Sequence, residues 1–484
     1  MAGRARRGSV LIIVLWVSFG LVSLAIYFAN SMSLEMRAAD NQVASLEAEQ
    51  AIEGAVRYVT NLLGNANSLA PGTMPDPHNF LCEAGQIGEG TFWLIGRTTN
   101  ELQTLSGQAY FGLVDESSKL NLNTATLEML EALPNMPPDV AASIIAWRSS
   151  SETNSAGGAE SQVYLSLPYG YSCKHAPFET VEELRLIYGM NLELLYGEDS
   201  NLNGILDANE NDGDLLPPYD NRDGRLEPGL FDYVTVYSRE PNTTTNGAAR
   251  INVSNLSATS TNLEQLATLL QQDAGIDDTR INEIFSSLGI SRGGGRGGAG
   301  GAGGGGGRGG GNTGAGAGAG AGGTQVKSVL EFYVRSKMTE QEFGAIANSI
   351  TVTNGSYISG LINVNTASQA VLSCVPGIGS NTAPSLVSYR QSNAGNSASI
   401  AWITNVLDPT NAIQAGPYLT ASAYQFTADI GAVGHQGRGF RRVKFVVDTS
   451  GGTPRILYRR DLMHLGWALG AQGRQDLLLA RRTR

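Results

Sequence analysis

An uncharged apolar segment near the N-terminus constrains this chain more than any other feature. After the basic leader MAGRARRG, residues 9–34 carry no charged side chain, and the first charge beyond them is Glu35. About 20 apolar residues in a helix span the hydrocarbon core of a bilayer, and flanking arginines favour the cytoplasmic side. We therefore expect one membrane span. A secretory signal peptide fits less well, because the segment is too long and no A-x-A-like cleavage site closes it.

The predicted helix continues beyond the membrane. Residues 34–63 contain no proline and are rich in Ala, Glu, Leu and Gln. Apolar residues recur three and four positions apart, as in an amphipathic helix, at Ile52, Ala55, Val56, Val59, Leu62 and Leu63. Gly64 then predicts the end of the helix. The result is one spine helix over residues 9–64, whose second half packs on a soluble domain.

The junction Arg7-Gly8-Ser9 resembles the class III signal of type IV pilins and pseudopilins. The resemblance implies that a prepilin peptidase cleaves after Gly8 and that the mature, N-methylated chain begins at Ser9. Most members of the family carry glutamate at the fifth mature position, where this chain has Ile13. Its absence is characteristic of the minor pseudopilin K of type II secretion systems, and implies a position at the tip of the pseudopilus.

An internal repeat occupies the middle of the chain. One copy opens with LNLNTA at 120–125 and the other with INVNTA at 362–367. Asn121 and Asn363 each lie 13 residues before a proline and 27 residues before an arginine. Both copies predict two short helices around a tight turn, with Thr124 and Thr366 as N-caps.

A third, degenerate copy of the repeat is indicated further along the chain. RINVS at 250–254 resembles the opening of the other two copies, and a helical run at 262–270 follows it.

The repeat resembles a helix-hairpin-helix unit, with Pro376-Gly-Ile-Gly379 as its hairpin. Such hairpins can present backbone N–H groups to DNA phosphates, so a DNA-binding uptake protein is one alternative. However, the first copy has Pro-Asn-Met-Pro instead of the glycines, and the net charge of −11 opposes phosphate binding. We therefore expect a packing unit and no nucleic-acid partner. Pseudopilin K is similar here, since it contains such units with comparable opening motifs.

The sequence DSNLNGILDANE at 199–210 fits the calcium loop of an EF-hand. Gly204 at position 6 permits the sharp turn, and Ile205 at position 7 offers its carbonyl. Oxygen donors fill positions 1, 3, 5, 9 and 12, namely Asp199, Asn201, Asn203, Asp207 and Glu210. Because asparagines replace two carboxylates, we expect a dissociation constant of about 10⁻⁴–10⁻³ M. A solvated acidic turn is the alternative.

A second calcium ion is an open alternative nearby. Asp220, Asp223 and Glu227 supply further oxygens, although Arg222 and Arg225 interrupt that loop.

The fold class expected is α+β: a pilin-like long N-terminal helix packed on a small antiparallel sheet, with a large inserted helical domain. Strands are expected at 90–96, 108–114, 424–430, 441–447 and 455–459, and near the calcium loop at 231–237. The boundaries we expect are a leader at 1–8, the spine at 9–64, sheet residues at 65–118 and 419–460, the insertion at 119–418 with its calcium region at 199–227, and a basic tail at 461–484. Residues 293–323 are almost all Gly and Ala, which predicts a disordered loop.

The remaining reactive side chains give little sign of catalysis. The four histidines have no metal-ligand spacing, and no nucleophile elbow, Walker loop or zinc signature occurs. We expect no enzyme activity. Of the three cysteines, Cys374 is expected to be a buried thiol, and Cys82 and Cys173 could pair or stay free.

The resemblance to pseudopilin K also implies a location and partners. It implies a single-pass protein of the bacterial inner membrane with its soluble domain in the periplasm, which helps to initiate pseudopilus assembly and the export of folded proteins. The implied partners are the I, J and H minor pseudopilins, the major pseudopilin, the prepilin peptidase and inner-membrane lipid, with secretion substrates or the outer-membrane secretin as further candidates. A minor pilin of a type IV pilus is the other alternative.

Overall fold

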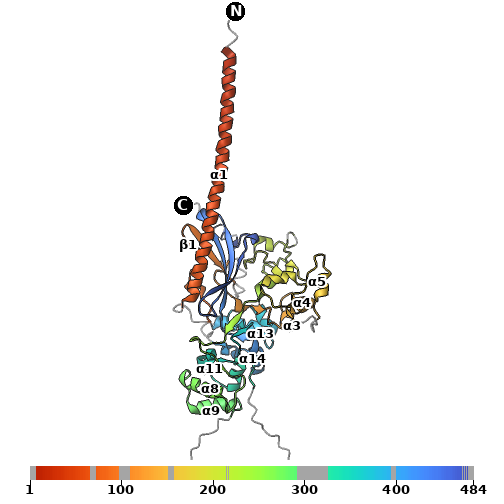
Figure 1. Ribbon diagram of the computed structural model, residues 1–484, viewed down its shortest axis with the longest axis vertical. Helices are drawn as coiled ribbons and strands as arrows, with labels where there is room; N and C mark the ends of the chain where they lie inside the picture. The colour runs from red at the N-terminus through yellow and green to blue at the C-terminus, as the bar shows by residue number, and fades with distance from the viewer. Residues whose placement is uncertain are drawn as a thin grey trace, which may run out of the picture.

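A computed structural model of the chain describes residues 7–65, 72–97, 109–150, 157–213, 215, 217–290, 325–393, 399–470, 473, 475 and 477. One long helix rises from a globular part that contains a sheet and many short helices (Figure 1). The expected disordered loop at 293–323 and most of the basic tail lie outside the described residues.

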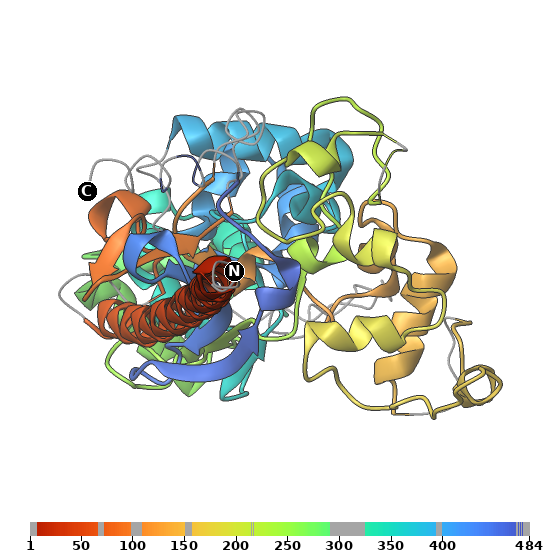
Figure 2. The ribbon, with the colours of Figure 1, turned by 90° about the horizontal axis from the view of Figure 1, so that it is seen from above.

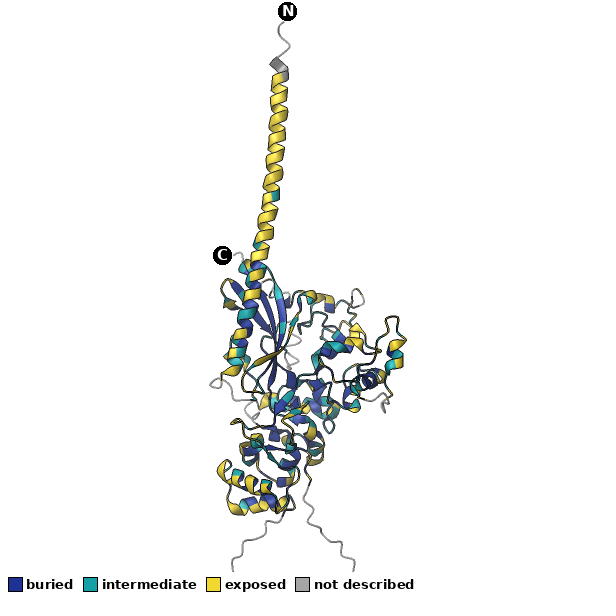
Figure 3. Ribbon diagram, in the orientation of Figure 1, coloured by how far each residue is buried: buried dark blue, intermediate teal, exposed yellow. Residues whose placement is uncertain are grey.

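Helix α1 (Arg7–Gly64) is the predicted spine. Its side chains are almost all exposed from Val10 to Val43, and burial begins at Ala44 (Figure 3). An 18-residue stretch has a mean hydropathy of 2.5 and no burial, so by length and composition the helix can cross a membrane. The first half of α1 is thus free of the protein and the second half packs on it.

The sheet has the strand order β1-β2-β12-β13-β14, and β3 pairs with β12 beside β2. All these pairings are antiparallel. The strands are β1 (Gly85–Ile87), β2 (Gly90–Ile95), β3 (Val114–Asp115), β12 (Gln425–Val433), β13 (Arg441–Asp448) and β14 (Arg455–Asp461). Strands from both ends of the soluble region therefore form one sheet, as predicted; of the segment expected at 108–114, only Phe111 and Val114 make strand contacts among the described residues.

The second half of α1 lies along this sheet, which explains its amphipathic pattern. The helix and sheet share an apolar core whose helical members are Ala48, Ala51, Ile52, Ala55, Val56 and Val59. Burial of these side chains stabilises the contact by about 25 cal/mol for each Å² of apolar surface removed from water. The alanines and Gly90, where an added Cβ would lie 2.9 Å from the Cβ of Ala51, allow the close approach.

The insertion between β3 and β12 is largely helical, as expected. Viewed along α1, its first part (yellow) lies to one side of that helix, and its green and cyan parts lie around the helix (Figure 2). Its α-helices in the described residues are α3 (Leu127–Glu131), α4 (Pro138–Arg148), α5 (Ser161–Leu165), α6 (Leu192–Tyr196), α7 (Leu230–Tyr233), α8 (Thr261–Gln272), α9 (Asp278–Ser287), α10 (Val329–Ser336), α11 (Glu340–Ile346), α12 (Gln369–Ser373), α13 (Gly379–Ser392) and α14 (Pro409–Ala415). An antiparallel pair, β6 (Arg239–Pro241) and β9 (Tyr357–Ser359), joins its parts. The predicted α+β class is confirmed.

Within the described residues, three parallel pairs of two-residue strands show three copies of the repeat. They are β4 (Leu120–Asn121) with β5 (Val234–Thr235), β7 (Ile251–Asn252) with β8 (Ile350–Thr351), and β10 (Ile362–Asn363) with β11 (Leu419–Thr420). In each pair an asparagine faces a threonine. The asparagine Oδ1 accepts from the N–H two residues on, and so does the threonine Oγ1. The third copy at 250–254 is therefore confirmed.

Two local predictions are wrong. The N-caps of α3 and α12 are Thr126 and Ser368, not Thr124 and Thr366. The asparagine turn holds Thr124 in its own backbone hydrogen bond to Asn121, so the helix begins later. The strand expected at 231–237 begins as helix α7, and only its middle, β5, is extended.

The cysteines are all free thiols. Cys374 is buried, as predicted. Cys82 packs beside the spine and sheet, whereas Cys173 is in the core of the insertion, so the two lie in different apolar clusters.

Candidate calcium loop and its attachment to the sheet

The loop at 199–210 folds around the side chain of Asp199, which is buried. One carboxylate oxygen accepts from the backbone N–H of Asn203 at 2.9 Å, and the other accepts from that of Gly204 at 2.8 Å. Gly204 has φ of +71°, where a side chain would be strained. The sharp turn expected at position 6 is therefore present.

Glu210 closes the other end of the loop. Its side chain is fully buried and accepts from the N–H groups of Ser200 and Asp207 at 3.0 and 3.1 Å. Burial, and then the charge of Asp199, raise the pKa of Glu210 to about 7. The loop thus concentrates negative charge away from water, an arrangement that a bound cation would relieve.

The asparagines supply the best test of whether the residues fit a cation. The Oδ1 atom of Asn201 is buried and has no hydrogen-bond partner. The amide nitrogens of Asn201 and Asn203 donate to Asp207 Oδ2 at 2.8 and 3.0 Å. Rotating either amide by about 180° would place its Oδ1, instead of its nitrogen, beside Asp207. Buried polar atoms rarely lack partners, so this orphaned oxygen fits a ligand position.

The donor set fits calcium better than a transition metal. In the part of the chain that the structure describes, no group of three or more His, Cys, Asp or Glu residues is arranged to hold a metal ion. The loop would therefore rely on the amide oxygens and the Ile205 carbonyl as well as its carboxylates. Calcium accepts such mixed oxygen ligands.

The residues proposed for a second ion are only partly together. Asp220 and Glu227 line a surface hollow of about 450 Å³, and Glu193 and Glu198 share it. Asp223 does not line this hollow, and one of its oxygens accepts from the N–H of Arg225 at 2.8 Å.

Two arginines that sequence reasoning missed attach the loop at 199–210 to the sheet. Arg442 on β13 is fully buried and binds both oxygens of Asp429 on β12. Its Nη1 donates to the carbonyl of Asn201, and its Nη2, which also binds Asp429, donates to that of Leu202, each at 2.5 Å. The loop backbone is thus fixed directly to the sheet.

Arg97, just after β2, holds the loop from a second direction. It donates to the Leu202 carbonyl at 2.7 Å and to Asp232 at 2.8 Å, and its guanidinium lies 3.8 Å from Asp199. The pKa of Arg97 is raised despite burial, because Asp232 and Asp199 lie beside it. Both arginines contact the carbonyl at the fourth position of the loop, and Arg442 also contacts that at the third, so the position of the loop depends on the sheet.

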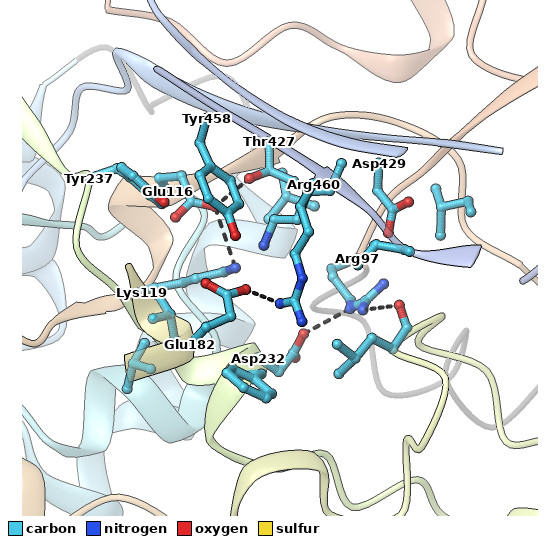
Figure 4. A pocket seen from close by; sticks show the side chains of 18 residues that line it. Arg97, Glu116, Lys119, Glu182, Asp232, Tyr237, Thr427, Asp429, Tyr458 and Arg460 are labelled. Carbon is cyan, nitrogen blue, oxygen red and sulfur yellow. Dashed lines mark hydrogen bonds and ion pairs between the residues drawn. The ribbon is translucent and has the colours of Figure 1, made fainter. Parts of the chain in front are cut away.

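Further charged side chains of the sheet and the insertion face one another beside apolar ones (Figure 4). A cavity of about 60 Å³ there is lined by charged residues from both sides. Glu116 is buried and accepts from Thr427 at 2.5 Å and from Thr235, with Lys119 3.5 Å away. Burial, followed by the charge of Lys119, lowers the pKa of Lys444. Such directional contacts fix the orientation of the insertion.

The residues expected for processing, Gly8 and Ser9, lie in the first turn of α1. They are at the end of the spine remote from the globular part (Figure 1).

The helix-hairpin-helix units are packed against neighbouring elements. An added Cβ at Gly377 would lie 2.6 Å from the carbonyl oxygen of Asn411 on α14, so the second hairpin is covered there. Arg148 donates to the carbonyls of Leu122 and Ala125, and Arg390 donates to that of Val364 at 2.9 Å. In these two copies the arginine therefore ties the second helix to the opening motif of the repeat.

Comparisons with known proteins agree with the sequence resemblance. Residues 102–196 match the family model for protein K of the type II secretion system, and residues 359–399 match that for the helix-hairpin-helix motif. No curated protein matches the chain. Among solved structures, one chain in the complex of GspK, GspI and GspJ from the type 2 secretion system of enterotoxigenic Escherichia coli is similar. The alignment covers 86% of this chain and 98% of that chain, at 12% identity and a TM-score of 0.35. The match over residues 102–196 confirms that this chain is similar to protein K of the type II secretion system.

Proposed function

We propose that the chain is a minor pseudopilin that caps the tip of a type II secretion pseudopilus. The observation that carries this proposal is the match of residues 102–196 to protein K, on a chain whose spine helix can cross a membrane. The prepilin peptidase would cleave after Gly8, leaving the soluble domain in the periplasm and the spine in the inner membrane.

The position of the insertion supports a cap. The helices α8, α9 and α11 lie at the end of the molecule opposite the free half of α1 (Figure 1). A subunit added beyond this chain would meet the insertion instead of an open end of the sheet. Ile13 supports the same position, because a subunit with nothing ahead of it needs no carboxylate to neutralise the next terminal amine.

Calcium would stiffen the cap. Asp199, Asn201, Asn203, Asp207 and Glu210, with the Ile205 carbonyl, would hold the ion, which supplies a cross-link between the two ends of the loop. Asp220, Asp223 and Glu227 remain candidates for a second ion. Since Arg97 and Arg442 join the loop to the sheet, a rigid loop would keep the insertion in one orientation.

The partners proposed are the I, J and H minor pseudopilins and the major pseudopilin. The solved complex named above contains GspK with GspI and GspJ, and we propose equivalent contacts for this chain. Secretion substrates or the secretin would meet the exposed end of the insertion.

Labelling of assembled pseudopilus fibres tests the proposal. The chain is expected at one end of each fibre, and labels along its length would contradict a cap. The variant Ile13→Glu restores the missing carboxylate and should allow some subunits to enter the shaft. Val14→Glu is the matched control, since it adds the same charge at the neighbouring position and should leave the label at the tip.

A further inference from the structure

A tight turn encloses the spine helix where that helix leaves the sheet. The turn joins β12 to β13 and contains the short helical segment His435–Gly437. An added Cβ at Gly434 would overlap the carbonyl oxygen of Ala44, and one at Gly439 would lie 2.6 Å from the same atom. Glycines at both ends of the turn thus let it close on the helix backbone.

His435 in this turn contacts two carboxylates of α1. Its Nδ1 lies 2.7 Å from Glu47 Oε2, and its Nε2 lies 2.9 Å from Asp40 Oδ1. The backbone N–H of His435 also donates to Glu47 at 2.8 Å. A carboxylate only accepts hydrogen bonds, and only the protonated imidazole donates from both ring nitrogens. The geometry therefore suits the charged ring.

Few other charges surround this histidine. Arg438 in the same turn pairs with Asp40, and Arg441 at the start of β13 donates to Ser45 Oγ at 3.1 Å. Strand β2 also packs on the turn, but its sequence GTFWLI has no titratable side chain. The side chains of His435 and Asp40 are 20% and 41% exposed, so protons can reach them from solvent.

We propose that His435 is a pH-sensitive clamp on the spine helix. With the ring charged, Asp40 and Glu47 are both held, and the helix is fixed up to the point where its side chains become exposed. When the ring is neutral, one of its nitrogens carries a lone pair and no proton. The carboxylate beside that nitrogen then loses its hydrogen bond, and the segment at 40–47 loosens. Histidine is the side chain that commonly changes charge near neutral pH, so we expect the stiffness of the joint between membrane helix and soluble domain to depend on pH. This inference does not depend on the role at the pseudopilus tip.

Hydrogen exchange of the full chain in detergent micelles tests the clamp. Protection of α1 residues 40–48 and of the turn at 434–439 is measured at pH 5.5 and 8.0 and corrected for the intrinsic pH dependence of exchange. We expect protection to fall roughly tenfold at the higher pH, equivalent to about 1.4 kcal/mol. No change in these segments would overturn the proposal.

Matched variants identify the responsible group. His435→Gln carries no charge and should give low protection that is the same at both pH values. His78→Gln removes an exposed histidine that pairs with Asp76 away from α1, and should keep the full change. A change that persists in His435→Gln would overturn the proposal.

Two further measurements separate local loosening from unfolding. Exchange of helix α8 in the insertion reports on the global fold and should not respond to these variants. Asp40→Asn, at a half-exposed position, keeps the Glu47 contact. It should reduce the change in protection between the two pH values at least about threefold, and an unchanged difference would contradict the clamp.

Discussion

The carboxylate of Asp115 on β3 accepts a hydrogen bond from the side-chain amide of Asn363 at 2.8 Å, across 248 residues of sequence. The same oxygen accepts from Thr366 at 2.6 Å, and the other oxygen accepts from the N–H of Ser117 at 2.8 Å. Asn363 and Thr366 belong to the opening motif of the repeat copy at 362–367. The sheet and the helical insertion are therefore joined by the residues that identify the repeat.

The burial of Asp115 predicts a pH-dependent stability. Burial raises the pKa of this carboxyl from 3.8 to about 6. The folded state then binds the proton more tightly than the unfolded state, so the contribution of Asp115 is greatest below pH 4 and falls as pH rises to about 6. The loss corresponds to about 3 kcal/mol.

The variant Asp115→Asn isolates this contribution. The free energy of unfolding of the wild type, minus that of the variant, should fall as pH rises from 4 to 6.5, because only the wild type loses the contribution of Asp115. Asp273→Asn, at an exposed position, should give a difference that is flat with pH. A flat difference for Asp115→Asn as well would refute the assignment. Urea unfolding of each protein at each pH measures the free energy of unfolding.

Calcium should stabilise the chain through the loop at 199–210. With a dissociation constant of about 10⁻⁴–10⁻³ M, 10 mM calcium raises the free energy of unfolding by about 1.5–3 kcal/mol. Glu210→Gln should abolish this gain, while Glu264→Gln on the exposed side of α8 should retain it. Thermal unfolding with calcium, and with magnesium as the comparison ion, distinguishes these cases.

Asn201 offers a gain-of-function test of the same site. Because its Oδ1 is buried without a partner, Asn201→Asp would place a charged oxygen where we propose a ligand. Calcium affinity should rise by roughly tenfold, since affinity follows the number of charged ligands. Titration calorimetry that gives unchanged or weaker binding would exclude Asn201 as a ligand.

Arg442 should be essential for the joint between loop and sheet. Arg442→Met leaves Asp429 buried without its partner, which costs about 3–5 kcal/mol. The double variant Arg442→Met, Asp429→Asn should recover much of that stability but still free the loop, because the contacts to Asn201 and Leu202 remain lost. Limited proteolysis at 199–213 would detect the freed loop, and continued protection in the double variant would argue against the joint.

The repeat allows one contact to be compared with its counterpart. Arg148 donates to two carbonyls, whereas Arg390 donates to one and has a buried Nη2 without a partner. Arg148→Met should therefore destabilise the chain by about 1 kcal/mol more than Arg390→Met, the net value of one hydrogen bond. Equal losses in denaturant unfolding would show that the extra contact is not stabilising.

The sequence predicted the elements whose signal is local. The spine helix follows from an unbroken apolar segment and an amphipathic continuation, and both ends agree with the structure within two residues. The turn at Gly204 follows from the spacing of oxygen donors around one glycine. In each case the residues that decide the structure lie within one or two turns of chain.

Features that depend on distant partners could not be predicted. From the sequence, Arg442 is expected to be an exposed strand residue, because nothing near it indicates that Asp429 and the carbonyls of the loop at 199–210 surround it. The threonines that complete the three parallel pairs lie 57 to 114 residues from their asparagines, so the repeat is visible only through its opening motif. The capping residues were misplaced for a related reason, since the asparagine turn delays the helix by two residues.

Mass spectrometry of the N-terminus tests the central claim most directly. The chain is extracted from membranes of cells with and without an active prepilin peptidase. A mature, N-methylated chain beginning at Ser9 only when the peptidase is active is the predicted result. An intact leader, or cleavage beyond Ala29, would contradict the proposal that this chain is a pseudopilin.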